Sequence, residues 1–110
     1  MSAHESGTPA SGDSAKRLIR DKIDAVDSQL LVLLNERMSH VIAIGEIKHA
    51  AGERLYDPER ERAILQRLAD ENNGPMTSDA VMRLFERIID ESRYIERKHV
   101  EGDSNKELKG

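Results

Sequence analysis

The chain has 110 residues, of which 35% are charged, and a formal net charge of -4 at pH 7. This length fits one small domain, and the charge balance excludes a general nucleic-acid binder, which needs a basic face. The chain has no cysteine, which excludes disulfides and thiolate chemistry, and its four scattered histidines lack the spacing of a metal site. No stretch reaches the roughly 18 apolar residues of a membrane helix, and the N-terminus lacks a signal-peptide pattern. We therefore expect a cytoplasmic protein that binds no membrane.

The first part of the chain predicts a polar leader followed by one long helix. Residues 1–13 are small and polar with Gly and Pro, which is typical of a disordered segment. From about Ser14 to about His49, apolar residues recur at steps of three and four, as on one face of a helix, and only Arg37 breaks this pattern. This apolar seam consists of Ile19, Ile23, Val26, Leu30, Leu33, Val41 and Ile44. Gly52 is a suitable left-handed stop after it.

Two further helices follow. Asp57-Pro58 is a strong helix start, because Asp is a favoured N-cap and Pro a favoured first residue. This second helix has a short apolar face and ends at the Asn-Asn-Gly-Pro run of residues 72–75. A third helix begins near Thr77 or Ser78, and residues 101–110 again read as a disordered tail. The prediction is an all-α fold of a long, a short and a long helix, with a domain over residues 14–100.

The length of the first helix indicates a second copy of the chain. At about 1.5 Å per residue it measures about 50 Å, and the rest of so short a chain cannot cover that length. Small domains often gain stability by forming oligomers. We therefore expect an intertwined homodimeric helical bundle.

Polar side chains interrupt the apolar seams of all three helices. Each singly has a structural interpretation, because long cationic stems reach water from helix ends and acidic residues suit a helix start. Together they would place surplus cations in the interior, and buried unpaired charge is costly enough to favour an anionic ligand. The interrupting residues are Arg37 and Lys48 on the first helix, Asp57, Arg60 and Glu61 on the second, and Ser92 and Glu96 on the third.

Arg20 is a further candidate, seventeen residues before Arg37 on the same helix. That spacing is about 25 Å along the axis. Arg20 can therefore join the other cations only from a second chain that runs antiparallel.

Four segments carry a specific pattern: IRDKIDAVD at residues 19–27, LLVLLNER at 30–37, IGEIK at 44–48 and YDPERER at 56–62. These segments resemble the AroQ chorismate mutases, a family of all-helical enzymes. The resemblance covers about residues 15–98, and its specificity lies in cations placed at the family's spacing without a gap. The resemblance implies a homodimer with shared active sites that converts chorismate to prephenate, in phenylalanine and tyrosine biosynthesis, with no cofactor and no metal.

The resemblance also implies roles for individual residues. Arg37 would grip one carboxylate of chorismate, with Arg20 contributed by the other subunit. Arg60 and Ser92 would hold the ring carboxylate. The ring hydroxyl would bind Glu61 and backbone near Asp57, and Lys48 would donate a hydrogen bond to the ether oxygen whose bond breaks.

Glu96 departs from the best-known bacterial pattern, in which a neutral Gln donates a second hydrogen bond to the ether oxygen. An ionised carboxylate cannot donate, so Glu96 would have to be protonated, as in members of the family that also carry Glu. Burial would raise its pKa and nearby Lys48 would lower it. The sequence leaves the balance open, and with it the pH optimum.

Two alternative functions remain. An isochorismate pyruvate lyase resembles this family in fold and cations, but the presence of both Asp57 and Glu61 favours the mutase. A non-catalytic helical dimerisation or regulatory module would gain from apolar residues at Arg37, Lys48, Arg60 and Glu96. The placed cations therefore favour an enzyme.

Overall fold

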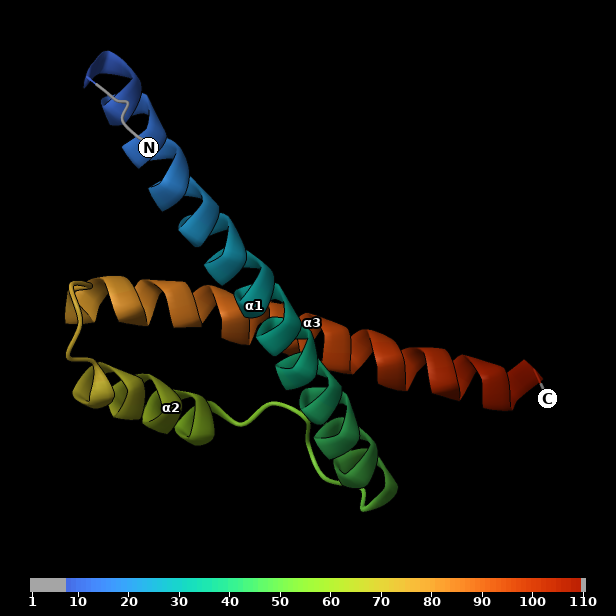
Figure 1. Cartoon of the computed structure of the whole chain (residues 1–110). Coiled ribbons are helices and arrows are strands. Elements are labelled where there is room, and N and C mark those ends of the chain that lie inside the picture. The colour runs from blue at the N-terminus through green and yellow to red at the C-terminus, as the bar shows by residue number, and fades with distance from the viewer. Residues whose placement is uncertain (1–7, 110) are drawn as a thin grey trace. The chain divides into compact units, whose positions relative to one another are not determined.

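The computed structural model describes residues 8–109, and the side chains of residues 12–102. Over this range the chain forms three α-helices and no strand: α1 spans Thr8–Ala50, α2 spans Pro58–Glu71 and α3 spans Ser78–Lys109 (Figure 1). The predicted all-α, long-short-long order is confirmed. None of the described helices is long and apolar enough to cross a membrane. The described part of the chain divides into two units, an N-terminal one that ends at Arg37 and a C-terminal one that begins at Met38.

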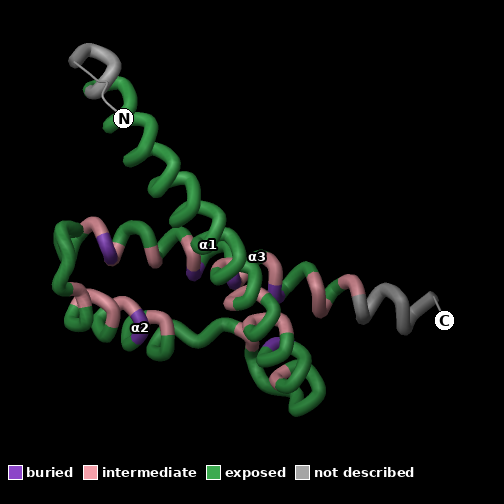
Figure 2. Tube along the Cα trace, in the orientation of Figure 1, coloured by how far each residue is buried: buried purple, intermediate pink, exposed green. Residues whose placement is uncertain are grey.

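The N-terminal unit is the first part of α1. Every residue from 12 to 33 is exposed (Figure 2), including the part of the apolar seam from Ile19 to Leu33. Ile23 is 52% exposed and Leu30 50%. An apolar stripe this open is typical of a surface that another molecule covers.

The C-terminal unit contains the end of α1 together with α2 and α3. The last two helices lie side by side as a hairpin (Figure 1). The buried apolar residues of the described part are Ile64 on α2 and Val81 and Ile89 on α3. Three buried side chains make a small core for a chain of this length.

Local signals in the sequence place the ends of the helices. The Asp57 carboxylate accepts a hydrogen bond from the Arg60 amide at 3.1 Å and so caps α2 ahead of Pro58. The Thr77 hydroxyl oxygen caps α3 by accepting from the Ala80 amide at 3.1 Å. After α1, Gly52 has a φ of 73° in the left-handed region, as predicted for the stop.

Both ends of the chain differ from the prediction. Helix α1 already includes residues 8–13 and α3 continues through residues 101–109, where the sequence predicts disordered segments; residues 1–7 and 110 lie outside the described range. Proline is tolerated in a first helical turn, as at Pro9, and single glycines such as Gly12 and Gly102 cost a helix only about 1 kcal/mol each. Extending an existing helix is easier than nucleating one, so these polar segments continue their helices.

Candidate active site

The C-terminal unit brings together charged and hydroxyl groups from all three helices. Lys48 on α1 and Glu61 on α2 both act electrostatically on the Glu96 carboxyl of α3, and Ser92 lies one turn before Glu96 on the same helix. Both α3 residues are buried. We call these four residues of the C-terminal unit, Lys48, Glu61, Ser92 and Glu96, the polar cluster.

The Lys48 side chain is half-buried and fixed in direction. Its Nζ donates a hydrogen bond of 3.1 Å to the carbonyl oxygen of Leu55, in the segment that follows the turn at Gly52. An ammonium group has three donors, so this bond orients the group and leaves two donors for a ligand.

Glu96 is buried, with 6% of its surface exposed. Burial raises the pKa of its carboxyl, Lys48 opposes this change, and the charge of Glu61 adds to it. The net direction is upward, which answers the question that the sequence leaves open. The environment therefore favours the protonated form, which can donate a hydrogen bond.

The absence of a side chain at Gly45 leaves the space that the Glu96 side chain occupies. The sequence alone did not identify this glycine as a site residue. A Cβ atom on this buried glycine would stand 2.6 Å from Glu96 Cγ and 3.0 Å from Oε2. A side chain here would displace the carboxyl. The available signal was a glycine within a helix, three residues before Lys48, where its conformational cost calls for a packing reason.

Ser92 is buried at 7% exposure and hydrogen-bonded to its own helix. Its Oγ lies 2.7 Å from the Ile88 carbonyl oxygen and 3.5 Å from Met38 Sδ. A hydroxyl has one proton and two lone pairs. Ser92 therefore donates to Ile88 here and must rotate to donate to a carboxylate.

Asp57 and Arg60 occupy the start of α2, and both are exposed. The Asp57 carboxylate is engaged as the helix cap, accepting from the Arg60 amide. Its side chain thus has a structural role, while its backbone remains the part that the predicted site would use.

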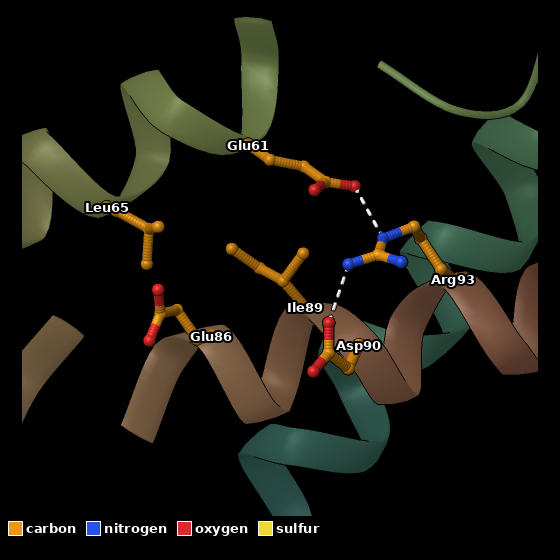
Figure 3. A pocket seen from close by; sticks show the side chains of 6 residues that line it. All are labelled: Glu61, Leu65, Glu86, Ile89, Asp90 and Arg93. Carbon is orange, nitrogen blue, oxygen red and sulfur yellow. Dashed lines mark hydrogen bonds and ion pairs between the residues drawn. The ribbon is translucent and has the colours of Figure 1, made fainter. Parts of the chain in front are cut away.

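Glu61 is paired with a residue that the sequence analysis did not single out. Arg93 Nε donates to Glu61 Oε2 at 2.8 Å, and Arg93 Nη2 donates to Asp90 Oδ1 at 2.6 Å (Figure 3). The Arg93 guanidinium also lies 5.6 Å from the centre of the Tyr56 ring. Arg93 directly follows Ser92, off the apolar seam, so its position alone gave no signal.

Arg20 and Arg37 lie on α1 in the N-terminal unit, where Arg20 is exposed and Arg37 is half-buried. Their part in a shared site stays a prediction. Within the residues that the structure describes, no group of three or more His, Cys, Asp or Glu side chains is arranged to hold a metal ion.

The C-terminal unit thus holds a buried carboxyl, Glu96, that is influenced by the Lys48 ammonium and by the Glu61 carboxylate. Residues 19–97 match the family model for chorismate mutase type II. The chain therefore belongs to the chorismate mutase type II family, as its resemblance to the AroQ enzymes indicates.

Two relatives show how much of a known protein the chain covers. The chain is 45% identical over 78 residues to a bifunctional chorismate mutase/prephenate dehydratase of Neisseria gonorrhoeae. The aligned region covers 71% of this chain and 21% of that protein. The chain is 32% identical over 99 residues to the chorismate mutase of Methanocaldococcus jannaschii, which covers 83% of this chain and 93% of that protein. The chain thus spans about a fifth of the bifunctional relative and nearly all of the other.

Solved structures give the same result for the fold. Chorismate mutase from Thermus thermophilus (form II) superposes with a TM-score of 0.74 at 34% identity, over 76% of this chain and 94% of that one. Chorismate mutase from Helicobacter pylori, solved in complex with prephenate, gives a TM-score of 0.75 at 26% identity, over 80% and 96%. The helical architecture is therefore that of chorismate mutases.

Proposed function

We propose that this chain catalyses the conversion of chorismate to prephenate, a Claisen rearrangement in phenylalanine and tyrosine biosynthesis. Family membership supports this activity, as does the near-complete coverage of the Methanocaldococcus jannaschii chorismate mutase. The observation that carries the proposal is the polar cluster, in which an oriented Lys48 and a buried Glu96 with a raised pKa converge. A cytoplasmic location stays a prediction of the sequence.

The chemistry suits a site made of fixed donors. The rearrangement is unimolecular, so it needs no nucleophile and no general base; the protein contributes by holding the compact, chair-like conformer. As the ether bond breaks, negative charge develops on its oxygen. Lys48, held by the Leu55 carbonyl, donates to this oxygen and stabilises the transition state without having to reorganise.

Glu96 supplies the second donor to the ether oxygen. Its raised pKa supports this role, because a carboxyl can donate only when protonated. Gly45 leaves the space in which this carboxyl lies against α1.

The remaining polar residues bind the substrate's own charges. Arg37 grips one carboxylate, and Arg60 together with a rotated Ser92 holds the ring carboxylate. Glu61 accepts a hydrogen bond from the ring hydroxyl, which backbone near Asp57 also binds. These roles follow the family pattern at matching positions.

The active protein is an intertwined homodimer with shared sites, in which Arg20 of the second copy completes the set of cations. The exposed apolar seam of residues 12–33 and the small core of the C-terminal unit support this assembly. A second copy with its α1 antiparallel would cover the seam.

The direct test is to incubate the purified chain with chorismate and identify the product. We expect prephenate, and isochorismate given separately should yield no salicylate and pyruvate. Lys48→Ala should reduce kcat by about 10²–10³-fold, whereas Lys98→Ala, at an exposed lysine of α3, should leave it unchanged. Salicylate from isochorismate without prephenate from chorismate would favour the lyase, and the absence of both products would favour a non-catalytic module.

A further inference from the structure

Arg93 joins three segments of the C-terminal unit. Its guanidinium donates through Nε to Glu61 on α2 and through Nη2 to Asp90 on α3, and it lies over the ring of Tyr56, just before α2. In Figure 3 the guanidinium stands between the two carboxylates, and each dashed line ends on a different acid. Arg93 thus restrains Glu61 by contacts that come from outside α2.

These contacts do little for the stability of the fold. The Arg93 side chain is 41% exposed and that of Asp90 is 53% exposed, and ion pairs at such exposure contribute little because water and salt screen them. The contacts matter for the direction of the Glu61 side chain, which is only 21% exposed. One carboxylate oxygen, Oε2, is occupied by a fixed donor.

The other oxygen of Glu61 keeps its acceptor capacity. An ionised carboxylate offers two oxygens and about four lone-pair positions, so a single N–H from Arg93 leaves room for a hydroxyl donor. An acceptor held in one direction is what a substrate hydroxyl needs.

We propose that Arg93 is a positioning residue for chorismate: by holding Oε2 of Glu61, it aims the second oxygen of that carboxylate at the ring hydroxyl of the substrate. The inference rests on the proposed function and extends it to a residue that makes no contact with the substrate. The hydroxyl stays away from the bond that breaks, so the contact contributes equally to the ground state and the transition state. Loss of such a contact raises KM and leaves kcat unchanged.

The test measures kcat and KM for Arg93→Met with two substrates, chorismate and a chorismate analogue that lacks the ring hydroxyl. We expect KM for chorismate to rise roughly tenfold, the usual scale for a hydrogen bond to a charged group, and KM for the analogue to stay unchanged. In a Glu61→Gln background, Arg93→Met should add no further change, because the two residues act through one contact.

Arg87→Met is the matched control. Arg87 lies on the same helix and, in the described contacts, pairs only with its own-helix neighbour Glu91. The KM of this variant should therefore equal that of the wild type.

Circular dichroism and the oligomeric state of each variant establish that it is folded. An equal rise in KM for both substrates, or a full effect of Arg93→Met in the Glu61→Gln background, overturns the inference while the proposed function stands. A wild-type chain that makes no prephenate in the same assay overturns the proposed function, and this inference with it.

Discussion

Glu96 is the residue at which burial and charge set the chemistry of the site. Its carboxyl has a raised pKa because burial outweighs the attraction of Lys48, and the charge of Glu61 acts in the same direction as burial. The folded state therefore binds the Glu96 proton more tightly than the unfolded chain does. As pH rises from the unfolded pKa through the folded one, the protein loses the hydrogen-bond donor and also loses stability.

Substituting Glu96→Gln should remove both pH dependences. The kcat of the wild type should fall as pH rises through the raised pKa, whereas the Gln variant, a permanent donor of nearly the same shape, should keep its kcat to higher pH. The free energy of unfolding of the Gln variant should also exceed that of the wild type above the raised pKa. Profiles of kcat against pH and urea unfolding at two pH values measure these differences, and parallel profiles for the two proteins would contradict the role of Glu96 as the titrating donor.

Gly45 leaves space for the Glu96 side chain, and a substitution here should disturb the site. In Gly45→Ala the new methyl group would meet Glu96 Cγ at 2.6 Å, so the carboxyl must move away from its place beside Lys48. We expect kcat to fall roughly ten- to hundredfold, because small displacements of a reacting group have effects of this size. Gly12→Ala is the control, since its Cβ meets nothing within 4 Å on the same helix; it should keep kcat and gain up to about 1 kcal/mol of stability. A Gly45→Ala protein with normal kcat would show that activity does not depend on this position of the Glu96 carboxyl.

The sequence predicted some site residues and missed others for one physical reason. Lys48, Ser92 and Glu96 interrupt periodic apolar seams, so local pattern alone marks them as unusual. Arg93 interrupts nothing, and its partners come from the segment before α2, from α2 and from α3. Contacts between segments distant in sequence leave no local signal, so only the folded chain reveals this residue.

Among the elements, the internal helix ends were predictable and the ends of the chain were not. Caps and stops are short-range: the Asp57 carboxylate, the Thr77 hydroxyl and the positive φ of Gly52 each act within a few residues. The prediction of disorder for the terminal segments rested on their polar composition, which indicates how little apolar surface they can bury. It does not say where a helix that has already formed will stop.

The terminal turns of α1 and α3 should be dispensable for chemistry although they are helical. The predicted site residues lie between Arg20 and Glu96, and the last described half-buried side chains before the acidic end of α3 are His99 and Val100. A protein of residues 14–100 should therefore fold and keep the kcat of the full chain. A protein of residues 14–95, which lacks Glu96, is the matched control and should be inactive. A folded 14–100 protein with most of its activity lost would contradict the prediction.

At the scale of the whole molecule, a single chain leaves its longest apolar surface open. Leu31 is 63% exposed and Val32 66%, next to seam residues that are about half exposed. Such surface favours association, because burying apolar area is the main driving force of stable interfaces. The sequence predicted a partner from the length of the first helix, the small size of the domain and the spacing of Arg20 and Arg37. The exposure of residues 12–33 agrees with a surface that a partner would cover.

Subunit mixing tests whether two copies of the chain share each active site. Arg20→Ala and Arg37→Ala proteins should each be nearly inactive, because every site of either homodimer lacks one arginine. After the two are mixed and their subunits exchange, each heterodimer should contain one complete site, which restores about a quarter of the wild-type sites in a random mixture. Chorismate consumption measures the recovery, and mass spectrometry of differently tagged subunits confirms the exchange. Recovery to about that level is the predicted result; no recovery despite demonstrated exchange would contradict a site built from Arg37 of one copy and Arg20 of the other.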